Sequence, residues 1–207
     1  MVLIFDEVSA GFRTRIGGIQ EFVGVTPDLA VFAKAISNGY PMGAVVGKRD
    51  VMQAAETMFI SSTYWSDPIG LVAALTTIRE LRRRDVPAYL NQLGIDLQTQ
   101  LNAVASEVGL NVICGGLPVH PALQFGVSDP TVKSQLTTFY IQEMAKRGCH
   151  GYASFYLNAA QGAAEVEQTA AAARAVFAGL RDALESGTLA QRLECDLSQD
   201  AFRRLVR

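Results

Sequence analysis

Residues 3–13 read LIFDEVSAGFR, an apolar run that ends in Asp6 and Glu7. A continuous apolar run with polar groups at its carboxyl end is typical of a strand buried on both faces of a parallel sheet. A Gly-rich stretch then leads to further short apolar runs at residues 29–33 and 44–46. The pattern predicts an α/β sheet whose functional groups gather at the ends of its strands.

Beyond Pro68 the apolar residues recur every three or four positions, which predicts helices. Two strand-like pieces separate the early helices from the late ones, and glycines end the late helices. This second half therefore reads as a small α+β domain reached through long helices. The helices are expected near residues 68–81, 90–108, 133–147 and 166–185, and the strands near residues 111–114 and 122–127.

Composition and charge narrow the class of protein. The 207 residues carry a formal net charge of -2 and are 49% hydrophobic, which indicates a globular chain. The only basic cluster, residues 82–84, falls where a helix should end, so we expect no nucleic-acid partner. No apolar run approaches the roughly 18 residues of a membrane span, and no signal peptide is recognisable, so we expect no membrane partner.

The cysteines point to a cellular compartment. Cys114, Cys149 and Cys195 are odd in number and have no CxxC spacing, so they indicate neither a disulfide framework nor a zinc site. We expect no bound metal and a reducing, cytoplasmic environment.

An acidic residue after a buried strand also occurs in nucleotide triphosphatases, which need a phosphate-binding loop as well. Such a loop has two glycines separated by four residues, then Lys and a hydroxyl residue. Here three residues separate Gly43 from Gly47, and Arg49 follows Lys48 where the hydroxyl belongs. The sequence therefore does not favour a triphosphatase.

Asp6 and Lys34 fit a different cofactor. Pyridoxal phosphate needs a carboxylate facing its pyridinium nitrogen and a lysine that forms a Schiff base with its aldehyde. Asp6 and Lys34 each follow a predicted strand, with one loop between the two strands. Neighbouring strand ends would bring the two side chains to opposite ends of one ring. Spacing alone leaves open that Asp6 is a cap and Lys34 a solvated surface residue.

The sequence around Asp6 and Lys34 is more specific than their spacing. LIFDEVSAGFR at residues 3–13, followed by GVTPDLAVFAKAISNGYPMGAVVG at residues 24–47, resembles the class III aminotransferases among the fold-type I pyridoxal phosphate enzymes. Within them the resemblance is greatest to the glutamate-1-semialdehyde 2,1-aminomutase group. It implies a pyridoxal phosphate-dependent enzyme that moves an amino group between an amino acid or amine and a carbonyl compound.

The resemblance also implies roles for individual residues. Asp6 takes the place of the pyridinium partner, Val8 that of the side chain packed on the ring, and Lys34 that of the Schiff-base lysine. The segment SSTYWSDP at residues 61–68 resembles the one whose threonine, here Thr63, binds the cofactor phosphate of the neighbouring subunit. A homodimer with a shared active site is therefore expected.

The resemblance predicts a division into domains. Residues 1–84 would be the C-terminal part of the large cofactor-binding domain, with a mostly parallel sheet. Residues 85–187 would be the small C-terminal α+β domain. Apart from the resemblance, the apolar residues of the last stretch predict an amphipathic tail over residues 188–207 that docks weakly on the body or on a partner; these residues are Leu189, Leu193, Leu197, Phe202 and Leu205. Family members are considerably longer, so we expect that an upstream half is missing; the alternative is a catalytically silent truncated subunit or gene fragment that acts only by dimerisation.

Four further residues are candidates for the site. His120 and His150 lie in loop-like contexts, which favours structural or solvent roles. Arg13 is interpreted as a structural ion partner rather than a substrate clamp. Glu7 either forms a hydrogen bond near the site or helps to end its strand.

Overall fold

The structure of the chain is a computed structural model that describes residues 1–198. It divides into two compact units, Met1–Asn91 and Gln92–Arg207. The predicted domain boundaries at residues 84/85 and 187/188 stay predictions. Within the described residues no helix is both long and apolar enough to cross a membrane.

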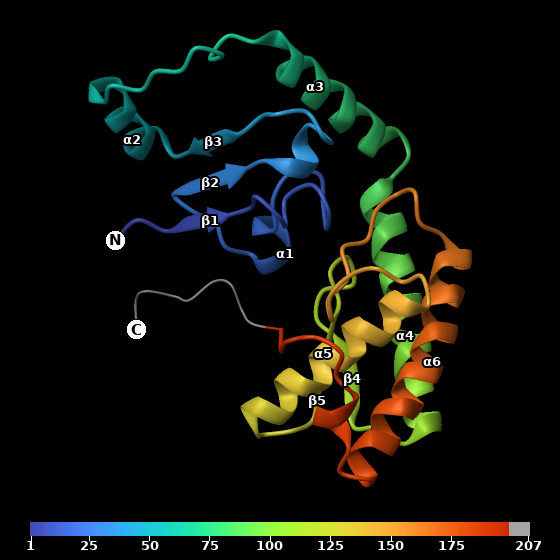
Figure 1. Cartoon of the computed structure of the whole chain (residues 1–207). Helices are drawn as coiled ribbons and strands as arrows, with labels where there is room; N and C mark the ends of the chain where they lie inside the picture. Colours follow the sequence, from blue (N-terminus) through green and yellow to red (C-terminus); the bar gives the residue numbers. More distant parts are fainter. Residues whose placement is uncertain (199–207) are drawn as a thin grey trace. The chain divides into compact units, whose positions relative to one another are not determined.

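The first unit is built on a small sheet of order β1-β2-β3 (Figure 1). β1 (Ile4–Asp6) runs parallel to β2 (Leu29–Phe32), and Asp6 lies opposite Val31. β3 (Ala44–Gly47) runs antiparallel to β2. The three predicted strands are therefore present, and their class is the predicted α/β arrangement with a partial sheet.

Apolar residues of β2, of the segments that follow β1 and β2, and of the helix at residues 68–83 form a small core in this unit. It contains the buried residues Phe12, Ala30, Phe32, Ile36 and Ala74. The expectation that the strands are buried on both faces is wrong for this chain. Ile4 of β1 is 55% exposed, and Val45 and Val46 of β3 are 52% and 51% exposed. They are exposed because no described residue covers those positions of the strands.

The helix expected after Pro68 is α3 (Pro68–Arg83). Asp67 caps it by accepting a hydrogen bond from the Ile69 amide at 2.9 Å, and Pro68 suits the first turn because its missing N–H needs no partner there. Only part of the predicted apolar face is covered. Ile78 and Leu81 pack against the core, whereas Leu71 and Leu75 are exposed. The short helices of this unit are α1 (Gln20–Val23), α2 (Arg49–Met52) and the 3-10 helices Lys34–Ile36 and Gln53–Thr57.

The elements beyond α3 match the predicted helices and strands. α4 (Val86–Val108) continues through Gly94, where a Cβ would clash with the backbone of Pro118. Gly94 therefore permits close packing rather than interrupting the helix. The other elements are β4 (Val112–Gly115) and β5 (Ala122–Phe125), which pair antiparallel, α5 (Pro130–Lys146), α6 (Ala163–Glu185) and the 3-10 helix Leu189–Arg192.

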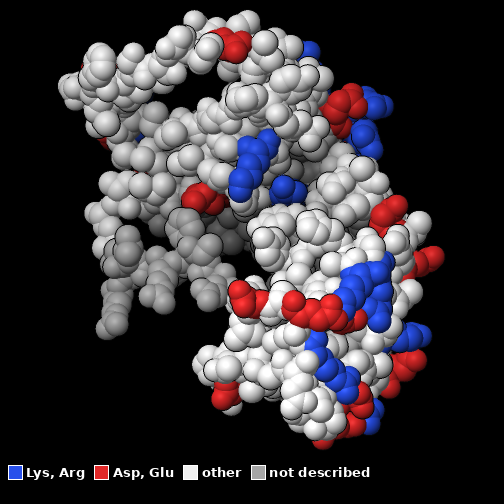
Figure 2. Space-filling view, viewed as in Figure 1, with Lys and Arg blue, Asp and Glu red and all other residues white. Residues whose placement is uncertain are grey.

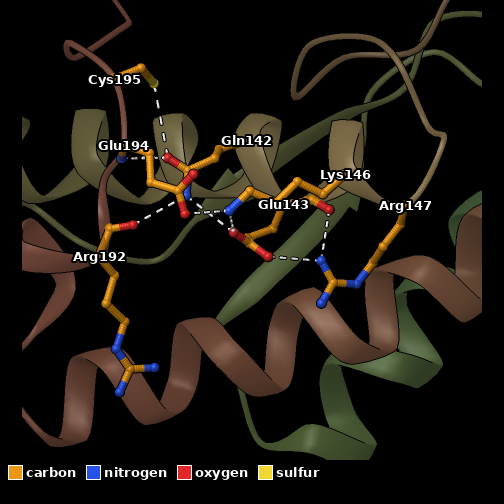
Figure 3. Close-up of polar contacts among 7 residues, drawn as sticks. All are labelled: Gln142, Glu143, Lys146, Arg147, Arg192, Glu194 and Cys195. Atoms are coloured by element: carbon orange, nitrogen blue, oxygen red, sulfur yellow. Dashed lines mark hydrogen bonds and ion pairs between the residues drawn. The ribbon is translucent and has the colours of Figure 1, made fainter.

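Residues 192–198, the C-terminal segment, lie along α5 and are held mainly through their backbone (Figure 3). Gln142 donates to the Arg192 carbonyl at 3.1 Å and accepts from the Glu194 amide at 2.7 Å. Thr138 accepts from the Ser198 amide, and Ser134 donates to the Ser198 carbonyl. These contacts place residues 192–198 on α5. The amphipathic tail predicted over residues 188–207 stays a prediction, and Phe202 and Leu205 lie outside the described residues.

Charged side chains of both signs gather over the second unit in the view of Figure 2. A central group on α5 is Glu143, which pairs with Lys146 and Arg147, each at 2.8 Å. Burial opposes ionisation of Glu143, but hydrogen bonds from Lys146, Arg147 and Gln142 outweigh it and lower its pKa to about 2. Lys146 also pairs with Glu194 of the C-terminal segment at 2.5 Å.

Candidate active site

Asp6 and Lys34 lie at neighbouring strand ends, as the sequence predicts. Asp6 is the last residue of β1, and Lys34 comes two residues after the end of β2. Because β1 and β2 are parallel, their carboxyl ends meet at one edge of the sheet. The fold therefore brings one acidic and one amine side chain to the same edge.

The amine of Lys34 is held by a hydroxyl group. Its Nζ donates to Ser9 Oγ at 2.6 Å, and the residue is exposed. Within residues 1–198 the amine has no carboxylate within ion-pair distance. An amine that donates only to a hydroxyl is available for covalent chemistry, because no ion pair has to be broken first.

The backbone of Lys34 is itself unusual. Its φ is 49°, in the left-handed region that non-glycine residues rarely adopt. Such strain persists where the surrounding structure over-determines it and is concentrated at functional sites. It places the lysine at the sharp turn between β2 and the following 3-10 helix, Lys34–Ile36.

The Asp6 carboxylate is tied on one side only. Its Oδ1 accepts a hydrogen bond from the amide of Val8 at 3.0 Å, and the residue is exposed. This Asx-type contact orients the side chain while leaving acceptor capacity for an N–H donor. Val8 itself is half-buried at the start of the loop.

Ser9 is a residue that the sequence reasoning missed. It lies in the loop after β1, where its carbonyl accepts from Arg13 Nε at 2.9 Å. A hydroxyl residue three positions after the strand-end aspartate was the available signal, but its partner 25 residues away became visible only in the fold. Arg13 thus contacts the loop, in keeping with a structural role.

Thr63 is not brought to this group. It is exposed in the turn before α3, and within the described part of the chain it forms no hydrogen bond with Asp6, Ser9 or Lys34. Its role therefore stays a prediction. His120 belongs to the second unit, where it is hydrogen-bonded to the Phe155 carbonyl at 2.8 Å and stacked on Tyr156.

These residues suit pyridoxal phosphate. Asp6 has free acceptor capacity for the pyridinium N–H, and Lys34 presents an amine without a carboxylate partner. Val8, between them in the loop, is the residue expected to contact the ring. No described group of three or more His, Cys, Asp or Glu side chains could hold a metal ion.

Comparisons with known proteins agree. Residues 1–115 match the family Aminotransferase class-III. The chain is 36% identical over 158 residues to 3-aminobutyryl-CoA aminotransferase of Cloacimonas acidaminovorans (strain Evry), covering 73% of this chain and 38% of that protein.

Solved structures show the same fold. One is the PLP internal aldimine form of the Sphingopyxis sp. MTA144 FumI protein, with a TM-score of 0.79, 26% identity and coverage of 89% of this chain and 44% of that chain. Another is an omega-transaminase from Sphaerobacter thermophilus, with a TM-score of 0.77, 28% identity and coverage of 87% and 45%. The chain thus spans less than half the length of these proteins. The architecture is that of fold-type I transaminases, the cofactor is pyridoxal phosphate, and the chain belongs to the class III aminotransferase family.

Proposed function

We propose that this chain is part of a pyridoxal phosphate-dependent aminotransferase that moves an amino group from an amino acid or amine to a carbonyl compound. The observation that carries the proposal is the placement of Asp6 and Lys34 at adjacent ends of β1 and β2, where the side-chain amine of Lys34 bonds only to Ser9 among the described residues. When bound, the cofactor supplies an electron sink for the carbon that loses its proton.

Each residue has a task that follows from its chemistry. Lys34 would bind the cofactor aldehyde and, once displaced by the incoming amine, carry a proton as a free amine. Asp6 would accept the pyridinium N–H and keep the ring cationic, and Val8 would pack on its face. Ser9 would hold the Lys34 amine in position.

Chemical trapping tests this assignment. The full chain is incubated with excess pyridoxal phosphate, reduced with borohydride and mapped by peptide mass spectrometry. We expect the label on Lys34 and its loss in Lys34→Ala, while Lys48→Arg, which alters a lysine paired with Asp28 at 2.8 Å, keeps it. A label on Lys48 or Lys133 with Lys34 unmodified would overturn the proposal.

We also propose that the protein is a homodimer in which Thr63 binds the cofactor phosphate of the partner. What supports it is an exposed apolar stretch that surrounds Thr63, comprising Met58, Phe59, Ile60, Tyr64 and Trp65. Mixing Lys34→Ala with Thr63→Val subunits should restore trapping or activity, because one site then regains both residues. No restoration after verified subunit exchange would exclude the shared site.

A second candidate is a catalytically silent subunit that acts only by dimerisation, and the same exposed apolar stretch favours it. Transaminase turnover by a full-length protein that includes the proposed upstream half distinguishes the two. We expect this chain by itself to bind pyridoxal phosphate weakly and to show no appreciable transaminase turnover, because helix N-termini and charge-assisted hydrogen bonds normally hold the phosphate, and we propose that the residues supplying them belong to that upstream half.

Within the family, the resemblance to the glutamate-1-semialdehyde 2,1-aminomutase group supports aminomutase activity as an alternative to transamination. An aminomutase converts one substrate without a separate carbonyl acceptor, whereas a transaminase needs both. A screen of amino donors with and without acceptors therefore separates the two activities. We further propose a reducing, cytoplasmic location; the free state of Cys114, Cys149 and Cys195 supports it.

A further inference from the structure

Glu7 is a buried carboxyl group beside the proposed site that no role yet explains. It follows Asp6 directly and is only 1% exposed. Its Oε1 accepts a hydrogen bond from the amide of Ile19 at 2.7 Å. Its Oε2 is buried without a hydrogen-bond partner among the described residues.

The backbone of Glu7 also holds the loop at residues 8–19, at its start and at its first turn. Its amide donates to the Val31 carbonyl on β2 at 2.9 Å, and its carbonyl accepts from the Gly11 amide at 2.9 Å. Together with the bond to Ile19, these contacts fix the start, the first turn and the end of residues 8–19. Ser9 lies inside the first of these turns.

The packing around the carboxyl group leaves little room. A Cβ on Gly18 would lie 2.8 Å from Glu7 Oε1 and would clash with Gln20 Oε1, which is also buried without a described partner. A buried oxygen without a partner is costly, and native proteins keep few of them. An apolar residue would fill this space without that cost. The presence of a carboxyl group here therefore indicates that Glu7 serves to hold the loop rather than to fill the core.

We propose that Glu7 is a positioning residue: its carboxyl group anchors the end of the loop at Ile19, so that Ser9 stays on the amine of Lys34. This inference rests on the proposed function only in giving Lys34 a catalytic role. The anchoring itself concerns the chain's own residues and can be measured without cofactor.

The test is competitive labelling of lysines in the full chain with a trace of acetic anhydride, read by peptide mass spectrometry with Lys48 as the internal reference. Ser9→Ala should raise the labelling of Lys34 by a factor of about 2 to 10, the worth of one hydrogen bond. Glu7→Ala should raise it in the same direction. The double variant should equal Ser9→Ala, because both changes break one path. Unchanged labelling in folded Glu7→Ala, or additive effects, would overturn the proposal.

A conservative variant of Glu7 and variants of its hydrogen-bond partner Ile19 separate an effect on the loop from a loss of folding. Glu7→Gln keeps an acceptor for Ile19 and should leave Lys34 labelling at the wild-type level; a change there would assign the effect to charge and overturn the proposal. Ile19→Pro removes the donor at a φ of -74° that proline adopts, and should match Glu7→Ala, whereas Ile19→Val should not. Failure of borohydride trapping on Lys34 would reject the proposed function while leaving these comparisons intact.

Discussion

α3 and α4 have the same apolar period but different surroundings. On α4, Leu97 and Leu101 are 2% and 0% exposed, whereas on α3 Leu71 and Leu75 are 57% and 50% exposed. The second unit thus closes a core of its own, and the first leaves apolar surface open. The proposed site is therefore built on the unit that leaves more of its apolar surface exposed.

The largest expected effect tests the closed core. Leu101→Ala should lower the free energy of unfolding by about 2–5 kcal/mol, because the side chain is fully buried and leaves a cavity. Urea unfolding followed by far-UV circular dichroism measures it. A loss below about 1 kcal/mol would contradict the view that the second unit has a well-packed core.

Acid should weaken the second unit next. The folded pKa of Glu143 is about 2, below its ordinary value of 4.5, so its stabilisation is complete above pH 4.5 and is lost as pH falls toward 2. We expect roughly 1–2 kcal/mol over this range, less than the full shift because such pairs are partly screened. Glu143→Gln should flatten the dependence. Glu107→Gln, which breaks an exposed pair with Arg174, is the control and should not.

Gln142→Ala should have a smaller, local effect. It removes both bonds to the backbone of the C-terminal segment, so the Glu194 amide should exchange hydrogen faster by a factor of about 5 to 10, equivalent to about 1 kcal/mol. Hydrogen-exchange mass spectrometry measures it. Gln92→Ala removes a glutamine bonded to Asp96 on α4 and should leave that amide unchanged. Equal exchange in the two variants would show that Gln142 does not hold the segment.

Leu75→Ala should change stability least. The side chain is half exposed and both residues favour helix, so the free energy of unfolding at low concentration should shift by less than about 0.5 kcal/mol. A large loss would mean that the α3 face is covered within a single chain. Dilution-dependent sedimentation of the same variant sharpens the point, because weakened self-association would place Leu75 in the proposed dimer contact.

Local patterns predicted the elements well and their surroundings less well. The strand that ends at Asp6 and the strand that ends shortly before Lys34 follow from apolar runs of a few residues. The helix that starts at Pro68 follows from its cap. The exposure of Ile4 could not be predicted, because it depends on which other segments pack against the strand. The Ser9–Lys34 bond was missed for a related reason: it joins residues 25 positions apart through a turn that no local pattern specifies.

The row of Ser134, Thr138 and Gln142 on α5 contacts backbone atoms of the C-terminal segment, which every residue type except proline offers in full. Over evolutionary time the side chains at residues 193, 195, 196 and 197 are therefore free to drift without loss of these bonds. Selection should act instead on the length of the segment and against proline at residues 194 and 198, whose amides are the donors. Homologous chains that keep Ser134, Thr138 and Gln142 on α5 should show variable residue types in the C-terminal segment and a constant segment length.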